Sequence, residues 1–177
     1  MTYTLNLKAF TDSIGDRALK QLCRENPDLR FETDKSGKLI VMSPTGSETG
    51  KRNGDLFGQI WYWNYQTKLG VVFDSSTGFR LFNGAIRSPD VSWIENFRWN
   101  SLSDEQKRGF APIDPDLAIE LIASSRFAVP KERRWTPVHS PTDSLTETQQ
   151  KMQEYMDCGV KLGWLINPDG REVALKD

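Results

Sequence analysis

The chain has 177 residues, of which 37% are hydrophobic and 27% are charged, and its formal net charge is −1. This composition is typical of one folded domain, and the near-neutral charge argues against a protein that coats nucleic acid through many phosphate contacts. No segment has the roughly 18 uninterrupted apolar residues of a membrane span, and the first ten residues lack the pattern of a secretory signal. We therefore expect a cytoplasmic protein with no membrane partner.

The first third of the chain predicts a helix, a hairpin and a second helix. Residues 11–24 carry apolar side chains at helical spacing. Two β-prone runs, 29–33 and 38–42, flank a polar segment that ends in glycine, which is typical of a hairpin. Residues 47–69 form the longest predicted helix, and Gly70 is expected to end it in the left-handed conformation.

Short strands are predicted next, over residues 71–73, 78–82 and 90–94, and three consecutive strands favour an antiparallel or mixed sheet. Residues 103–106 are consistent with a short helix. Residues 117–122 form an apolar run that a single charge interrupts.

The last third predicts one helix and one hairpin. Residues 144–158 begin with the capping box Ser144-Leu-Thr-Glu147 and end at Gly159, which predicts a helix. The runs 162–166 and 172–175 flank a turn segment and predict a hairpin. The whole pattern predicts a domain built from both helices and strands, of the α/β (α+β) class.

Carboxylates are the side chains expected to carry any chemistry. The chain has two cysteines, Cys23 and Cys158, without a CxxC pair, and one histidine, His139, in a proline-rich stretch. This inventory disfavours both a zinc site and a Ser-His-Asp mechanism.

Two carboxylates stand out by their position. Asp90 opens a predicted strand directly after Pro89, whereas the other three Pro-Asp pairs lack that setting. Glu120 lies inside an apolar run, where an ionised carboxylate needs a partner or a metal. One polar connection separates the two segments, as neighbouring strands require. Carboxylates on rigid strands suit Mg²⁺, which can hold a phosphate and lower the pKa of an attacking water.

The resemblance to a known family is carried by several stretches that together cover most of the chain: residues 31–32 and 37–39, 42–47, 88–91, 115–121, and 151–165. In these stretches the chain resembles the cyanobacterial type of the Uma2 family, which consists of restriction-endonuclease-like proteins in the PD-(D/E)xK nuclease superfamily.

The resemblance implies a mixed central β-sheet flanked by helices and a DNA substrate. It also implies that Asp90 and Glu120 bind Mg²⁺, with Mn²⁺ as an alternative, and that Glu32 contributes an outer acidic group. The superfamily lysine is absent two residues after Glu120, where Ile122 stands. Lys151, on the following predicted helix, is the matching candidate for this catalytic cation.

Two departures from the family pattern affect the expected domain, which spans residues 1–177. An inserted loop is expected at about residues 123–139, because the segment Ser140-Pro-Thr-Asp143 follows the Glu-Leu pair later than in relatives. This insertion separates Glu120 from Lys151 in the sequence. The chain also ends at Asp177, earlier than family members that continue through further strands.

Each candidate has an ordinary structural alternative. Asp90 could cap a strand, and Glu120 could pair with Arg80 or Arg87. Lys151 could be a solvated helix residue.

Three further features have alternatives of the same kind. Glu32 could be a charge at the edge of the hairpin. The aromatic cluster at 61–65 is expected in the core or in a dimer contact rather than as a base-stacking surface, and with the family resemblance it makes a homodimer one expected assembly. The basic cluster 131–134 is expected on an exposed loop.

Two functions remain open on the sequence. The first is a Mg²⁺-dependent endonuclease that uses Asp90, Glu120, Lys151 and Glu32. The second is a catalytically inactive nuclease-fold domain that serves as a binding or interaction module. A glycosidase with paired carboxylates is disfavoured, because the chain is short for a carbohydrate cleft.

Overall fold

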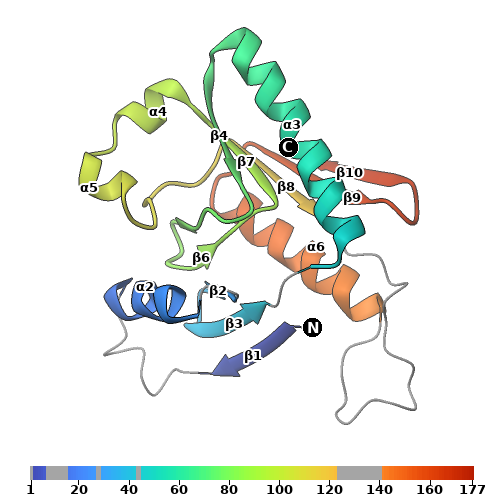
Figure 1. Ribbon diagram of the computed structural model, residues 1–177, viewed down its shortest axis with the longest axis horizontal. Helices are drawn as coiled ribbons and strands as arrows, with labels where there is room; N and C mark the ends of the chain where they lie inside the picture. The colour runs from blue at the N-terminus through green and yellow to red at the C-terminus, as the bar shows by residue number, and fades with distance from the viewer. Residues whose placement is uncertain (1, 7–15, 27–28, 43–44, 123–140) are drawn as a thin grey trace.

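The structure is a computed structural model that describes residues 2–6, 16–26, 29–42, 45–122 and 141–177 (Figure 1). The strands are β1 (Thr2–Asn6), β2 (Arg30–Thr33), β3 (Lys38–Met42), β4 (Gly70–Asp74), β5 (Phe79–Arg80), β6 (Ile86–Arg87), β7 (Val91–Glu95), β8 (Leu117–Leu121), β9 (Leu162–Asn167) and β10 (Glu172–Lys176). The helices are α2 (Asp16–Glu25), α3 (Ser47–Thr67), α4 (Asn96–Asn100), α5 (Asp104–Lys107) and α6 (Pro141–Asp157).

Two five-stranded sheets form the framework. Sheet A has the order β1-β3-β2-β6-β5, and sheet B has the order β10-β9-β8-β7-β4. The expected α+β class, with a β framework flanked by helices, is confirmed. The strands divide between two sheets because β5 pairs with β6, which continues sheet A from β2, whereas β4 pairs with β7 in sheet B.

Most of the predicted elements are present, with differences at their ends. The hairpins β2–β3 and β9–β10 are confirmed. Helix α6 begins at Pro141, a residue favoured in the first turn, so Ser144 lies inside the helix instead of capping it. Strands β1 and β6 and helix α4 were not predicted. Residues 11–15 of the first predicted helix, the expected insertion with its basic cluster, and His139 lie outside the described residues.

Helices α3 and α6 cover opposite faces of sheet B, because side chains along a strand alternate between the two faces. The α3 face is lined by a cluster of apolar side chains from both elements: Val91, Leu117, Ile119, Leu56, Phe57 and Ile60. The α6 face is lined by a second set: Ile94, Ala118, Leu165, Met152, Tyr155 and Val160. Glu120 therefore shares the face of Ala118 and points toward α6.

Helix α6 is the crossover that joins two parallel strands. Strands β8 and β9 are parallel neighbours, with Leu117 opposite Leu162 and Glu120 opposite Leu165. Parallel neighbours need a long connection, and here α6 supplies it across one face of the sheet (Figure 1). The crossover brings the middle of α6 over strand β8.

Helix α3 carries exposed aromatic side chains, one of which, Trp63, also packs edge-on against Trp93 of β7 with ring centroids 5.6 Å apart. Trp61, Tyr62, Trp63 and Tyr65 are between 41% and 62% exposed, and the rings of Trp61 and Tyr65 stack with centroids 5.3 Å apart. The interpretation of this cluster as core is therefore wrong, because the apolar positions that face the sheet are Leu56, Phe57 and Ile60. A dimer contact through this surface stays a prediction.

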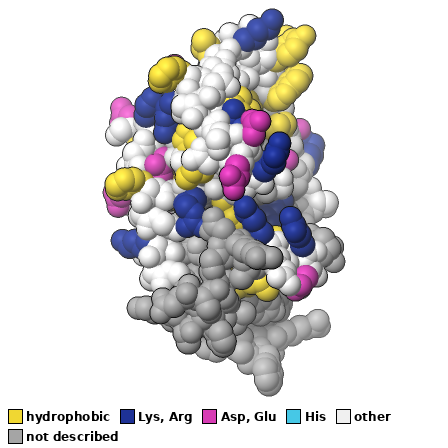
Figure 2. Space-filling model, turned by 90° about the vertical axis from the view of Figure 1, so that its left-hand side faces the viewer, with side chains coloured by type: hydrophobic (Ala, Val, Ile, Leu, Met, Phe, Trp, Pro, Cys, Tyr) yellow, Lys and Arg dark blue, Asp and Glu magenta, His cyan; other side chains and the backbone are white. Residues whose placement is uncertain are grey.

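The face of the molecule seen in Figure 2 shows no large patch of a single charge sign. Lys and Arg side chains are interspersed there with Asp and Glu side chains and with separate hydrophobic groups. In the part of the chain that the structure describes, no helix combines the length and the apolar character that crossing a membrane would require.

Helix α3 ends two residues earlier than predicted. Lys68, rather than Gly70, adopts the left-handed conformation, with φ 56° and ψ 30°. Gly70 instead opens β4, where the Asn64 side chain donates to its carbonyl oxygen at 2.8 Å and accepts from its N–H at 3.0 Å. A Cβ at this position would lie 2.2 Å from the carbonyl oxygen of Ile94, so the close approach of the chain to β7 requires glycine.

We expect Gly70→Ala to lower the free energy of unfolding by roughly 1–3 kcal/mol, because backbone atoms of β7 must move to admit the methyl group. Gly58→Ala is the matched control on α3, where an added Cβ meets nothing within 4 Å. It should raise the free energy of unfolding by about 0.5–1 kcal/mol, since alanine is the better helix former. Urea unfolding measures the free energy of unfolding of both variants. A Gly70→Ala protein as stable as the wild type would show that β7 admits the added methyl group without cost.

Candidate active site

Asp90 and Glu120 come from neighbouring antiparallel strands, as the sequence predicts. Val91 of β7 lies opposite Ile119 of β8, and continuing this register by one residue places Asp90 opposite Glu120. Glu120 belongs to the α6 face, and Asp90, directly before β7, lies close enough for its negative charge to raise the pKa of Glu120. The geometry brings together the two groups that the sequence analysis selected.

Asp90 is held from two directions. Its Oδ2 accepts the backbone N–H of Leu121 at 2.8 Å, and its Oδ1 accepts Nδ2 of Asn53, on α3, at 3.0 Å. The first bond ties the residue to strand β8, and the second ties it to the helix on the other side of the sheet. Asp90 thus has a structural bond to the backbone and also a fixed orientation beside Glu120.

Lys151 reaches from α6 into this pair of strands. Its Nζ lies 2.8 Å from Oε1 of Glu120, 2.8 Å from Oε1 of Glu32 and 3.3 Å from the carbonyl oxygen of Ser88. The side chain is 15% exposed. The alternative of a solvated surface lysine is therefore wrong, and three acceptors match the three protons of an ammonium group.

Glu32 is fully buried at the junction of the two sheets, so the alternative of a charge at the hairpin edge is wrong. Its Oε1 accepts the N–H of Ser88 at 2.9 Å in addition to Lys151, and its Oε2 accepts Nη1 of Arg87 at 3.2 Å. Both oxygens are engaged by protein donors. These contacts make Glu32 the partner that holds Lys151, and sheet A supplies it to a site otherwise built on sheet B.

Arg87 pairs with two carboxylates other than Glu120. Its Nε donates to Oε2 of Glu154 at 2.6 Å, in addition to its bond with Glu32. The alternative of an Arg87–Glu120 pair is therefore wrong, because the cation beside Glu120 is Lys151. Arg87 extends the charged cluster from the site toward the surface of α6.

Tyr155 is a site residue that the sequence analysis did not single out. Its hydroxyl group donates to Oε1 of Glu120 at 2.9 Å, and its ring lies 5.8 Å from Nζ of Lys151. Lys151, Glu154 and Tyr155 are three and four residues apart on α6, which places them on one helical face. That spacing was the available signal for Glu154 and Tyr155, whereas the sequence offers no comparable signal for Asn53.

Burial and neighbouring charges separate the pKa values of the site. Burial, together with the negative charges of Asp90 and Glu32, raises the pKa of Glu120 to about 7 against the opposing effect of Lys151. Burial alone would also raise the pKa of Glu32, but the cations Lys151 and Arg87 outweigh it and hold this pKa below its ordinary value. Burial would favour neutral Lys151, but the two adjacent glutamates outweigh it and raise its pKa.

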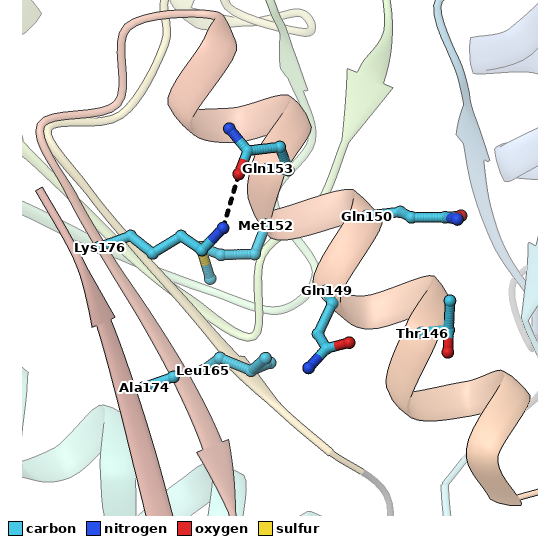
Figure 3. A pocket seen from close by; sticks show the side chains of 8 residues that line it. All are labelled: Thr146, Gln149, Gln150, Met152, Gln153, Leu165, Ala174 and Lys176. Atoms are coloured by element: carbon cyan, nitrogen blue, oxygen red, sulfur yellow. Dashed lines mark hydrogen bonds between the residues drawn. The ribbon is translucent and has the colours of Figure 1, made fainter.

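A surface groove next to α6 lies beside the charged cluster of the site, not within it. It has a volume of about 340 Å³ and lies between α6 and the β9–β10 hairpin (Figure 3). Its lining includes Gln149, Met152, Gln153 and Lys176, and Nζ of Lys176 donates to Oε1 of Gln153 at 2.6 Å. None of the paired charged residues of the site lines this groove, so the groove is separate from the charged cluster.

Comparison with solved structures identifies the class of fold. The chain has the fold of a "putative nuclease" of the DUF820 family from Anabaena variabilis, whose crystal structure matches with a TM-score of 0.54 and 18% sequence identity. The match covers 83% of this chain and 76% of that one. No curated protein matches the sequence.

The particular family follows from the sequence model that matches. The model of the Uma2 family, described as "Putative restriction endonuclease", matches residues 17–130 and 136–175. The chain therefore belongs to the Uma2 family, and the resemblance recognised in the sequence is confirmed.

The raised pKa of Glu120 predicts a pH-dependent stability. The folded-state pKa of about 7 lies above the ordinary value of 4.5, so the stability that protonated Glu120 contributes is fully present below pH 4.5 and is lost as the pH rises through 7. Glu120→Gln keeps a neutral acceptor for Tyr155. We expect this variant to exceed the wild type in free energy of unfolding by about 1–3 kcal/mol at pH 8 and to lose that advantage near pH 5.

Chemical unfolding at the two pH values in the presence of a chelator measures this difference. Glu172→Gln, on an exposed strand position, is the control and should change stability little at either pH. An advantage of Glu120→Gln that is equal at pH 5 and pH 8 would show that titration of Glu120 is not its cause.

Proposed function

We propose that the chain is a metal-dependent endonuclease that hydrolyses phosphodiester bonds of DNA. Asp90 and Glu120 are the proposed ligands of Mg²⁺, with Mn²⁺ as an alternative, and Lys151 is the proposed catalytic cation. The observation that carries the proposal is the buried Lys151 ammonium beside Glu120, with Asp90 close enough to act on the charge of the same glutamate. Membership of a family of restriction-endonuclease-like proteins supports the same reaction and substrate.

The charges of the cluster favour a bound cation. Its carboxylates are Glu32, Asp90, Glu120 and Glu154, and its cations are Lys151 and Arg87. When all six groups are ionised, the carboxylates exceed the cations by two negative charges. A divalent cation would cancel that excess and would favour the ionised form of Glu120, which the buried site otherwise penalises.

The donor atoms also suit a hard metal ion. Carboxylate and amide oxygens are the ligands that Mg²⁺ prefers, and the buried Oδ1 of Asn53, beside Asp90, has no hydrogen-bond partner. Within the described ranges, no three or more His, Cys, Asp or Glu side chains are grouped to hold a metal. In the proposed site the cation is held by two carboxylates together with other oxygens, such as amide groups, water and phosphate.

Glu32 has a different role from the outer metal-shell group that the resemblance implies. Two of the groups that bond to its oxygens are the cations Lys151 and Arg87, so positive charge already surrounds this carboxylate. We assign it instead the task of holding Lys151 when Glu120 binds the cation. Arg87, which Glu154 holds in turn, keeps Glu32 ionised and in place.

The side chains then have separate tasks in hydrolysis. A bound divalent cation would hold the scissile phosphate and lower the pKa of the attacking water. Lys151 exchanges its bond to Glu120 for one to the water or to a phosphate oxygen and stabilises the negative charge that develops there. Glu32 retains the ammonium during this exchange, and Tyr155 keeps Glu120 oriented.

Cleavage of plasmid DNA in Mg²⁺ or Mn²⁺ tests the proposal. We expect the wild type to cut, and we expect Asp90→Asn, Glu120→Gln and Lys151→Met to reduce the rate by at least about 100-fold, as loss of a catalytic charge or proton-transfer group does. Lys161→Met is the matched control, because Lys161 lies near the other end of β8 and pairs with Asp116. In this variant Asp116 retains Arg98 as a cationic partner. It should retain the wild-type rate.

Binding of the metal separates a nuclease from an inactive binding module of the same fold. Mn²⁺ should raise the melting temperature of the wild type but not that of Asp90→Asn, because a ligand that binds only the folded state stabilises it. A folded wild type that neither cuts DNA nor responds to either metal would reject the nuclease and favour the binding module.

A further inference from the structure

Asn53 links α3 to the proposed metal site. Its Nδ2 donates to Oδ1 of Asp90 at 3.0 Å, across 37 residues of sequence. The other end of the same amide group, Oδ1, is buried and has no hydrogen-bond partner. The other buried unpaired side-chain atoms in the described residues belong to Ser92 and to the Arg98–Asp116 ion pair.

An unpaired buried amide oxygen needs an explanation. Leaving such an acceptor without a donor costs about 1–3 kcal/mol, which folded proteins usually avoid. Among the described residues no donor pairs with Asn53 Oδ1, and Asp90, which the same amide group contacts, is itself an acceptor. A cation at Asp90 would relieve the cost, because an amide oxygen and a carboxylate oxygen can share one hard metal ion.

We propose that Asn53 Oδ1 is a further oxygen ligand of the cation at Asp90 and Glu120. This inference rests on the proposed function, and it adds a ligand from a helix to two ligands from strands. The site then draws on both layers that cover sheet B: α3 supplies Asn53, and α6 supplies Lys151 and Tyr155.

The test replaces the oxygen by sulfur, which gives a direct signal of ligation. Asn53→Cys is made in a chain in which Cys23→Ser and Cys158→Ser remove both native thiols. Thiolates are soft ligands, and direct bonding of a thiolate to Cd²⁺ produces a charge-transfer absorption band in the ultraviolet. We expect Cd²⁺ to produce this band in Asn53→Cys and to lose it when Asp90→Asn is added.

The control is Gln59→Cys in the same background, at an exposed position on the same helix, which should give no such band at stoichiometric Cd²⁺. Calorimetry with Cd²⁺ is run on each protein after circular dichroism has shown that it is folded. A folded Asn53→Cys protein that binds Cd²⁺ without the band would overturn the proposal.

A second pair of variants decides the matter if the thiol disturbs the site. Asn53→Ala and Asn53→Asp both remove the bond that Asn53 donates to Asp90. If Asn53 only orients Asp90, both variants should bind Mn²⁺ roughly 10–100-fold more weakly than the wild type, and the proposal is rejected. If Asn53 is a ligand, Asn53→Asp should bind at least as tightly as the wild type, whereas Asn53→Ala should bind at least about 10-fold more weakly.

The same calorimetry separates this inference from the proposed function. Wild-type protein that binds no Mn²⁺ would reject the metal site as a whole. Wild-type protein whose Mn²⁺ binding is lost in Asp90→Asn, but whose Asn53 variants behave as orienting mutants, would reject only the role of Asn53.

Discussion

The burial of one ammonium group, that of Lys151, is the interaction on which the site depends. It lies between a glutamate of sheet A and a glutamate of sheet B, and it is the point at which both sheets and helix α6 meet. Buried charges of one sign are strongly unfavourable without a partner, and Lys151 is the cation that both glutamates share, with Arg87 as a second partner of Glu32. The relative placement of the two sheets and the geometry of the site therefore rest on the same contact.

Around that contact, the protein holds an excess of negative charge that opposes its own stability. Arg87 pairs with Glu32 and Glu154, and Lys151 pairs with Glu32 and Glu120, but burial together with the charges of Asp90 and Glu32 still raises the pKa of Glu120. Charges that a fold tolerates at a cost are typical of functional sites. A divalent cation and the phosphate that it holds would turn this unfavourable arrangement into a bound state that is close to neutral.

Sequence reasoning located the parts of the site that local pattern determines. Asp90 follows a proline at the start of a strand, and Glu120 interrupts an apolar run, so each violates the expected pattern of its own segment. Glu32 and Lys151 entered through family resemblance, and their contact joins residues 119 positions apart, which no periodicity reveals. Asn53 lies on a helix with many polar residues, and only the fold brings it to Asp90.

The fold, like the site, was predictable from the sequence only where short-range patterns determine it. Hairpins and amphipathic helices depend on short-range patterns, and these were correctly predicted. The division into two sheets depends on where β5 finds a partner, and the exposure of the aromatic residues on α3 depends on which side of that helix meets the sheet. The left-handed residue at the end of α3 was misplaced because Gly70 is required by close contact with Ile94, not by its own backbone angle.

The parallel pairing of β8 with β9 also bears on how such a protein can diversify. Glu120 and Lys151 are fixed by strand register and by the packing of α6, both of which lie outside the connection formed by residues 123–140. The separation of the two charged groups is thus independent of how many residues that connection contains. Natural selection can therefore lengthen or rewrite this stretch of sequence without changing the distance between Glu120 and Lys151.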